Sequence, residues 1–319
     1  VDALFASLDT HSRRGHLASG DEALFVDTVG FTHTRSEAET RRYCIWPGQA
    51  CSYKIGQNKW VELRAKAEAA GLTLTDINKR DWQTYAALVL SPGIPYKFPQ
   101  PHRIVRMAEM TGVPIVGDME LFARAVQTLP ERGRPKIVGI TGTNGKSTTT
   151  ALIGHILKQA GRDARIGGNI GTGVLDLAAL HANAIYVLEL SSYQLDLVKS
   201  LHCDVAVLLN ITPDHLDRYD GFEAYRASKL RLFELQSGKH LNFVGAPDLY
   251  RELLSEGHST NPVEIETGAT CGNPSLSGPH NAQNTMAARL VCIELDLMPQ
   301  QIDHGVASFV GLPHRMERV

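Results

Sequence analysis

"PKIVGITGTNGKSTTTALIGHIL", residues 135–157, joins a short apolar run, a glycine-containing turn and an amphipathic segment. This order predicts a strand over Ile137–Ile140, a turn from Gly142 to Gly145 and a helix from about Lys146. Glycines let several backbone N–H groups converge without Cβ clashes, and a helix N-terminus favours anions. The segment therefore predicts an α/β fold with a phosphate-binding loop.

The residues after the turn indicate a nucleotide. Lys146 would reach the β- and γ-phosphates, and Ser147 or Thr148 would hold Mg²⁺. The common pattern G-x-x-x-x-G-K-[ST] is not met, because Ile140 stands five residues before Gly145. An ordinary strand-to-helix turn is the alternative, but it does not account for Lys-Ser-Thr directly after the glycine.

Outward from this segment, short apolar runs alternate with longer amphipathic ones from about residue 80 onward. "VPIVGD", "AIYVLELSS" and "CDVAVLLNITP" are such runs. This alternation is typical of a doubly wound parallel sheet with crossover helices. Hydrophobic residues at 43% and charged residues at 21% suit a globular chain, and a net charge of −2 argues against nucleic acid or an anionic membrane as partner.

The first 77 residues follow another pattern. They contain one helix candidate, residues 58–71, and no strand-turn-helix with a glycine fingerprint. The five cysteines of the chain are scattered without CxxC spacing, which favours reduced thiols in a cytoplasmic protein. No stretch has the length and apolarity of a signal peptide core or a membrane span.

Several motifs together carry a family resemblance. "TGTNGKST" resembles the phosphate loop of the Mur ligases and the related folylpolyglutamate synthetases. Further matches to the D-glutamate-adding branch of the Mur ligases follow over residues 78–319: "LSPGIP", "GDMELFARA", "GGNIG", "VLELSSYQLD", "LNITPDHLDRY", "AYRASKLRLFE", "GPHNAQNTMAA" and "GLPHRMERV". The resemblance implies ATP- and Mg²⁺-dependent ligation of D-glutamate to UDP-MurNAc-L-Ala through an acyl phosphate, in a cytoplasmic monomer.

The resemblance also implies roles for single residues. Glu189 ends an apolar run, where open α/β sheets place ligands, and would hold Mg²⁺; capping of the next helix is the alternative. His215 would help to hold a second metal, although a lone histidine is as often structural. Lys229 would be carbamylated and stabilise the metals, whereas composition alone predicts a solvated lysine on a helix surface.

The remaining site predictions come from the same resemblance. Asn281 and Asn284 share a helix face and would contact the nucleotide, unless one of them is only an N-cap. The predicted sets are as follows: catalytic Lys146, Glu189, His215 and Lys229; ATP-binding Gly142, Thr143, Asn144, Gly145, Lys146, Ser147, Thr148, Asn281, Asn284 and Arg315; substrate-binding Ser91, Pro92, Gly93, Asn169 and His215; metal-binding Ser147, Glu189, His215 and carbamylated Lys229.

The resemblance does not extend to the N-terminus. Residues 20–71 resemble the C-terminal end of the DUF885 proteins, which look like zinc-dependent peptidases, but no HExxH-like motif is present and peptidase activity is not expected. We expect four parts: a foreign helical segment, 1–77; a remnant of a UDP-substrate domain, 78–127; a central ATP-binding domain, 128–312; and the start of a linker to an absent third domain, 313–319.

Three functions remain open at this point. A working ligase would release phosphate only with both substrates present. A nucleotide-binding remnant would bind Mg-ATP without turnover, and the apparent truncation favours this for the chain itself. An interaction module would require that the first 77 residues fold and dock on their own. A different amide-forming ligase of the Mur or folylpolyglutamate type is a further alternative for the reaction.

Overall fold

The computed structural model describes residues 80–236, 240–255, 262–266 and 273–312, with isolated positions between 62 and 71. Contacts divide the chain into two compact units, Val1–Arg80 and Asp81–Val319, and the second contains the fold described below. Within the predicted helix over 58–71, the described residues Glu62, Ala65, Lys66, Glu68 and Ala69 are helical. Arg315 and most of residues 1–79 lie outside the described part.

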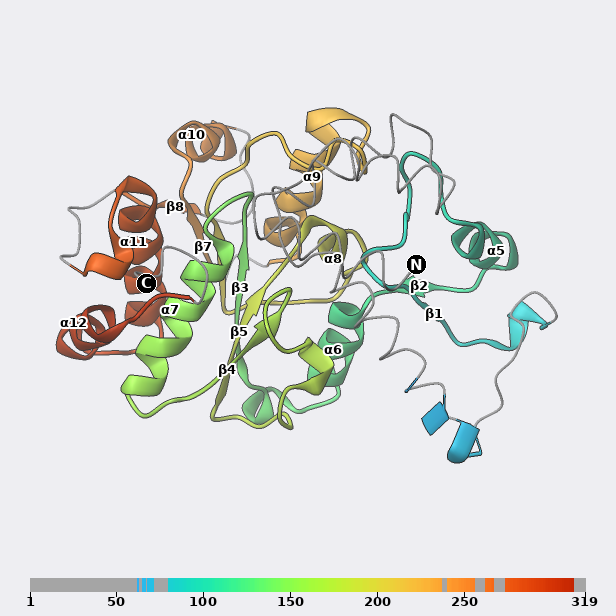
Figure 1. Ribbon diagram of the computed structural model, residues 1–319, viewed down its shortest axis with the longest axis horizontal. Helices are drawn as coiled ribbons and strands as arrows, with labels where there is room; N and C mark the ends of the chain where they lie inside the picture. The colour runs from blue at the N-terminus through green and yellow to red at the C-terminus, as the bar shows by residue number, and fades with distance from the viewer. Residues whose placement is uncertain are drawn as a thin grey trace, which may run out of the picture. The chain divides into compact units, whose positions relative to one another are not determined.

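A six-stranded parallel sheet forms the centre of the second unit (Figure 1). Its strand order is β4-β5-β3-β6-β7-β8, and every neighbouring pair is parallel. This confirms the predicted doubly wound α/β fold. The strands are β3 (Lys136–Thr141), β4 (Asp163–Gly168), β5 (Ala184–Glu189), β6 (Val205–Leu208), β7 (Leu241–Val244) and β8 (Pro262–Glu264).

Helices cover both faces of this sheet, and each face has its own apolar core (Figure 1). One core joins the sheet to α7 (Lys146–Gln159), α11 (Pro279–Glu294) and α12 (Pro299–Ser308). The other joins it to α6 (Asp118–Gln127), α8 (Ser192–Asp196), α9 (Gly221–Glu234) and α10 (Pro247–Ser255). Because both faces are covered, every residue of β5 and β6 is buried, as continuous apolar strands require.

A smaller parallel pair precedes the sheet. β1 (Leu88–Val89) pairs with β2 (Ile115–Val116), and α5 (Arg103–Thr111) connects them. The His102 side chain caps the start of α5, and Gly112 ends it in the left-handed conformation with φ 72°. The short 3₁₀ turns are η3 (Trp82–Thr84), η4 (Glu131–Gly133), η5 (Val174–Asp176) and η6 (Pro274–Leu276).

The strand order defines where ligands are expected. The chain leaves β3 towards β4 and leaves β6 towards β7, which lie on opposite sides of the β3–β6 pair. The carboxyl ends of β3 and β6 therefore flank the topological switch point, where open α/β sheets bind their ligands. The loops that follow these two strands, residues 142–145 and 209–220, form the centre of the site.

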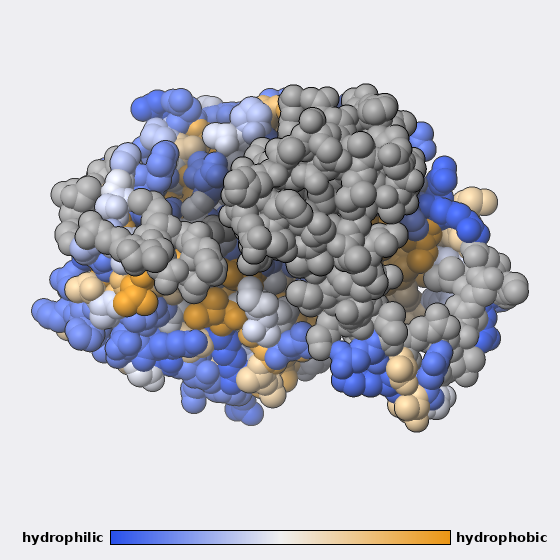
Figure 2. Space-filling view, in the orientation of Figure 1, coloured by the Kyte–Doolittle hydropathy of each residue, from blue (hydrophilic) through white to orange (hydrophobic). Residues whose placement is uncertain are grey.

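Hydrophilic residues cover most of the coloured surface in Figure 2, and the hydrophobic ones are scattered in small groups. Among the described residues, the most exposed large apolar side chains are Met110 and Val310, which lie far apart in the chain. No helix in this part of the chain has the length and apolarity needed to cross a membrane.

Candidate active site

The predicted strand, turn and helix are present at the positions expected. β3 ends at Thr141, and α7 begins at Lys146. Between them Gly142 has φ 149° and Gly145 has φ 84°, both in the region that favours glycine. The strand is one residue longer at each end than predicted, because residues 136 and 141 also pair with neighbouring strands.

Gly145 is required by sterics as well as by its backbone angle. A Cβ atom at this position would overlap the side-chain amide oxygen of Asn284, which lies on α11. Asn284 is buried, and it donates through Nδ2 to Asn281 Oδ1 at 3.1 Å. The N-terminal turns of α7 and α11 therefore meet directly at the end of the phosphate loop.

Neither asparagine caps its helix, because the N-cap of α11 is Gly278. The alternative that one of them is only an N-cap is therefore wrong. Both line a cavity of about 650 Å³ that begins at the phosphate loop. Its other lining residues come from six segments: Asn144, Gly145, Thr148, Asn210, Thr212, Gly245, Ala246, Ser275, His280, Gln283, Gly311 and Leu312.

Two lysines meet at one carbonyl oxygen of the phosphate loop. Lys146 Nζ donates to Gly142 O at 2.9 Å and to Thr143 O at 2.9 Å, so that this side chain folds back over its own loop. Lys229 Nζ donates to the same Gly142 oxygen at 2.8 Å. The predicted catalytic lysines are thus adjacent, although 83 positions separate them in the printed sequence.

Lys229 is not a solvated surface lysine, as composition alone predicts. Its side chain is only 2% exposed, since α9 packs on the sheet with this residue facing inward. Nζ also lies 4.8 Å from the centre of the Tyr225 ring. Burial, reinforced by the nearby charge of Lys146, lowers the pKa of Lys229 to about 7.

Glu189 lies at the last position of β5, beside the end of β3. It is 2% exposed, and Oε1 accepts a hydrogen bond from Asn169 Nδ2 at 2.9 Å. Its other oxygen, Oε2, is buried and has no hydrogen-bond partner. The next helix is capped instead by Ser191 with Gln194, so the alternative that Glu189 serves as a helix cap is wrong.

His215 lies in the loop after β6 with φ 52°, an uncommon backbone conformation for a residue other than glycine. Its side chain is about half exposed, with Nε2 3.7 Å from Asp214 Oδ2. The ring centre is 5.2 Å from that of Tyr193 and 6.1 Å from that of Tyr225. The two tyrosine rings therefore pack against the His215 ring, in the loop that follows β6.

Thr143 and Asn144 are held by the loop after β6. Thr143 Oγ1 accepts the Thr212 N–H at 3.0 Å and lies 3.1 Å from the Tyr225 hydroxyl. The Asn144 N–H donates to Asn210 Oδ1 at 2.9 Å. The sequence motifs assign no role to Asn210. Its position directly after the apolar run of β6 could have indicated that it lies near the phosphate loop, because β6 pairs with β3.

The predicted substrate turn lies beside a second cavity. In this turn the Ile94 N–H donates to Ser91 O at 3.0 Å, and Arg218 donates to Gly93 O at 3.1 Å. Arg218 also stacks over the Tyr193 ring at 4.7 Å. The cavity, of about 400 Å³, has Pro92 in its wall. The turn is thereby tied to the loop that carries His215.

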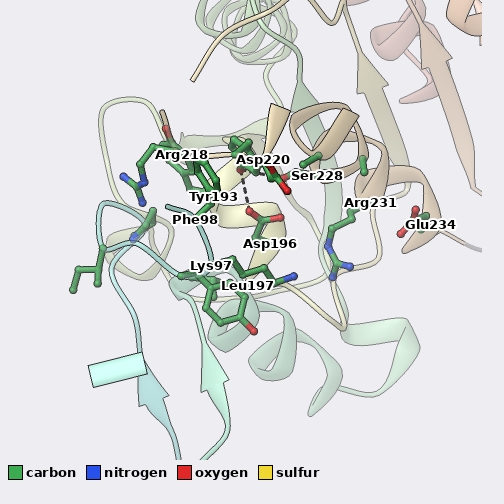
Figure 3. Close-up of a pocket in the computed structure, with 16 residues that line it drawn as sticks. Lys97, Phe98, Tyr193, Asp196, Leu197, Arg218, Asp220, Ser228, Arg231 and Glu234 are labelled. Carbon is green, nitrogen blue, oxygen red and sulfur yellow. Dashed lines mark hydrogen bonds between the residues drawn. The ribbon is translucent and has the colours of Figure 1, made fainter. Parts of the chain in front are cut away.

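Figure 3 shows Asp196 central in this second cavity, with Arg218 and Tyr193 to one side and Arg231 and Glu234 to the other. Asp196 Oδ2 accepts a hydrogen bond from the Tyr219 hydroxyl at 2.9 Å. Burial raises the pKa of Asp196 above its usual range. The cavity is thus lined by aromatic rings and by charges of both signs.

The predicted site residues therefore fall into groups. Lys146, Glu189 and Lys229 lie around the carboxyl ends of β3 and β5, with Ser147 buried in the first turn of α7. Asn281 and Asn284 line the first cavity on the α11 side of the loop, and Pro92 of the predicted substrate turn lines the second cavity. Among the described residues, no three His, Cys, Asp or Glu side chains form a group that could hold a metal ion.

A family model described as the Mur ligase middle domain matches residues 140–273. The matched range begins within β3 and includes the phosphate loop, Glu189, His215 and Lys229. This six-stranded domain therefore belongs to the Mur ligase family.

Within that family, the sequence is similar to the D-glutamate-adding enzymes. It is 46% identical over 288 residues to the UDP-N-acetylmuramoylalanine–D-glutamate ligase of a Caulobacter species, a match that covers 81% of this chain and 61% of the relative. The enzyme of the same name from Sphingopyxis alaskensis is 46% identical over 263 residues, covering 81% and 59%. The chain thus spans about three fifths of the length of these relatives.

Solved structures support the fold. A UDP-N-acetylmuramate:L-alanyl-gamma-D-glutamyl-meso-diaminopimelate ligase from Neisseria meningitidis superposes with a TM-score of 0.53 at 18% identity, covering 78% of this chain and 87% of that one. A murein peptide ligase from Psychrobacter arcticus gives 0.51 at 17% identity, covering 80% and 62%. At these identities the likeness concerns the fold alone.

A second family model, a bacterial protein of unknown function (DUF885), matches residues 20–95. This supports the predicted join of two unrelated sequences. The match extends beyond residues 20–71, on which the resemblance was based, and it includes Ser91, Pro92 and Gly93. The assignment of that turn to a Mur-type substrate site stays a prediction.

Proposed function

We propose that the chain binds Mg-ATP at the phosphate loop, and that its reaction is the ATP-dependent ligation of D-glutamate to UDP-MurNAc-L-Ala. The observation that carries the proposal is the convergence of Lys146, Lys229 and Glu189 at the carboxyl edge of β3 and β5. Sequence similarity to D-glutamate ligases supports the choice of substrates. We further expect a cytoplasmic monomer that binds neither nucleic acid nor membranes.

The loop fits a nucleotide. The start of α7 favours phosphate oxygens, because the first N–H groups of a helix have no acceptor inside it and lie at the positive end of the helix dipole. Because Gly145 has no Cβ, the loop can lie close to the Asn284 side chain. Both residues line the cavity of about 650 Å³. In this arrangement the phosphates would contact Gly145, Ser147 and Thr148, and the nucleoside would extend towards Asn281.

The donor set fits Mg²⁺. Ser147 offers a hydroxyl in the first turn of α7, and Glu189 offers a buried carboxylate oxygen without a partner. Mg²⁺ takes few protein ligands and completes its shell with phosphate oxygens and water. When bound, the ion neutralises charge on the phosphates during phosphoryl transfer.

The residues of the chain would then act by position and charge. Lys146 would leave Gly142 O and Thr143 O and bind phosphate oxygens. A substrate carboxylate oxygen would attack the γ-phosphorus, with ADP leaving and an acyl phosphate forming. The amine of D-glutamate would attack the acyl carbon, releasing phosphate and losing a proton. Carbamylated Lys229, His215 and Asn169 are proposed to support the metal and substrate side of this reaction.

Phosphate release by the full chain tests the proposal. The assay contains Mg-ATP and either UDP-MurNAc-L-Ala, D-glutamate, both or neither. The proposed ligase releases phosphate only when both substrates are present, and Lys146→Ala abolishes the release. Binding of Mg-ATP without release under any condition would instead establish a nucleotide-binding protein without this activity.

A further inference from the structure

We propose that Asn210 is a positioning residue of the phosphate loop, holding Thr143 and Asn144 so that the α7 side of the loop faces the phosphates. The proposal rests on the proposed nucleotide function. Asn210 follows β6, which pairs with β3 in register Thr141 to Leu208. The Leu209 N–H continues this ladder to Thr141 O at 3.1 Å. Asn210 therefore emerges beside the first residues of the loop.

Three hydrogen bonds join Asn210 to the middle of the loop. Its backbone oxygen accepts the Thr143 N–H at 2.9 Å. Its side-chain Oδ1 accepts the Asn144 N–H at 2.9 Å, and Nδ2 donates to Asn144 O at 3.1 Å. One amide side chain thus satisfies both backbone groups of the same residue, as a neighbouring strand would.

These bonds divide the loop into two functional halves. The N–H groups of Thr143 and Asn144 are engaged by Asn210, which removes them as donors for a phosphate. At the start of α7 the helix dipole favours an anion, and the three hydrogen bonds from Asn210 to the loop all go to Thr143 and Asn144 rather than to this side. Asn210 therefore determines which side of the loop binds phosphate.

Gly142 supports the same arrangement. With φ 149° it lies in the region that favours glycine, and a Cβ there would be 3.3 Å from both the backbone N and O of Asn210. The first and last glycines of the loop thus allow different close contacts. The missing Cβ of Gly142 leaves space for the Asn210 backbone, and that of Gly145 leaves space for the Asn284 side chain.

Hydrogen exchange of the nucleotide-free full chain tests the positioning directly. In Asn210→Ala, the backbone amide of Asn144 should exchange at least about tenfold faster than in the unaltered chain, because its acceptor is gone. Asn210→Asp keeps an oxygen acceptor but replaces the Nδ2 donor to Asn144 O with a second acceptor, so it should also speed exchange of the Asn144 amide. Unchanged exchange of the Asn144 amide in Asn210→Ala would overturn the proposal.

Titration with Mg-ATP tests the consequence for binding. Asn210→Ala should raise the Kd about tenfold while the melting temperature stays within a few degrees. Asn183→Ala is the matched control. Asn183 is exposed and directly precedes β5, at the amino-terminal end of the strands and away from the phosphate loop, so the Kd of this variant for Mg-ATP should not change. An unchanged Kd in Asn210→Ala would contradict the proposal. If the unaltered chain binds no Mg-ATP, the proposed function fails, and the exchange experiment still decides the role of Asn210.

Discussion

Lys229 on α9 and Gly142 in the phosphate loop are joined by a 2.8 Å hydrogen bond from Nζ to the carbonyl oxygen. The same oxygen accepts from Lys146 Nζ at 2.9 Å. Two amines thus share one acceptor, and burial together with the charge of Lys146 lowers the pKa of the buried Lys229 to about 7. This relationship underlies the expectation that the loop takes phosphate and that Lys229 changes its charge.

We expect Lys229 to react reversibly with carbon dioxide, because the uncharged amine is the nucleophile. A pKa of about 7 leaves most of the amine uncharged at pH 8, in contrast to an exposed lysine near 10.4. After addition of ¹³C-bicarbonate, a ¹³C carbamate signal should grow as the pH rises through about 7 and should be absent in Lys229→Met. A signal of equal size in Lys229→Met would contradict this expectation.

Gly145→Ala should impair both folding and nucleotide binding. The left-handed backbone costs about 1–2 kcal/mol for alanine, and the new Cβ must also displace Asn284. Gly161→Ala is the matched control, with φ 75° but open space around its Cβ. Urea unfolding should show about 1–2 kcal/mol lost in the control, with the Mg-ATP Kd unchanged. Gly145→Ala should lose more stability and bind at least about tenfold more weakly; equal behaviour of the two variants would count against the Asn284 contact.

Glu120 should stabilise the junction of α6 with the segment after α8. Its buried carboxylate accepts from the Lys199 N–H at 2.8 Å, the Ser200 N–H at 3.0 Å and Arg124 Nε at 2.8 Å. Burial acts to raise the pKa of Glu120, but these hydrogen bonds outweigh it and lower the pKa. Glu120→Gln should therefore cost roughly 2 kcal/mol at pH 7, because charge-assisted bonds are lost.

The pH dependence follows from the lowered pKa. The contribution of the carboxylate is fully present above the unfolded pKa of about 4.3 and is lost as the pH falls through the lower folded value. The difference in unfolding free energy between the parent and Glu120→Gln should thus be constant from pH 7 to 5 and shrink below about 4. Glu131→Gln, at an exposed position, provides the control. A difference that persists unchanged to pH 3 would refute the role of the charge.

The fold was largely predictable, because local patterns dominate it. The phosphate loop, α7 and the strand end at Glu189 follow from apolar runs and glycines within a few residues of each other. Burial of Lys229 was not predictable from composition, since a lysine within an amphipathic helix looks the same whether it faces solvent or a site. Its inward face depends on how α9 packs against the sheet.

The same limit applies to Asn210. Its partners, Thr143 and Asn144, lie in another loop, and only the pairing of β6 with β3 brings the loops together. The helix-cap alternatives for Glu189 and Asn281 failed for a related reason. Ser191 and Gly278 occupy those cap positions, and a cap depends on where the helix actually begins.

The most direct test of the central claim is calorimetric titration of the full chain with Mg-ATP. Lys146→Ala should raise the Kd roughly 10- to 100-fold, the equivalent of about 1.5–3 kcal/mol for lost charge-assisted hydrogen bonds. Lys158→Ala, an exposed lysine in the last turn of the same helix, should leave the Kd unchanged. If the unaltered chain binds no Mg-ATP, or if Lys146→Ala binds it as tightly as the unaltered chain, this account of the phosphate loop is contradicted.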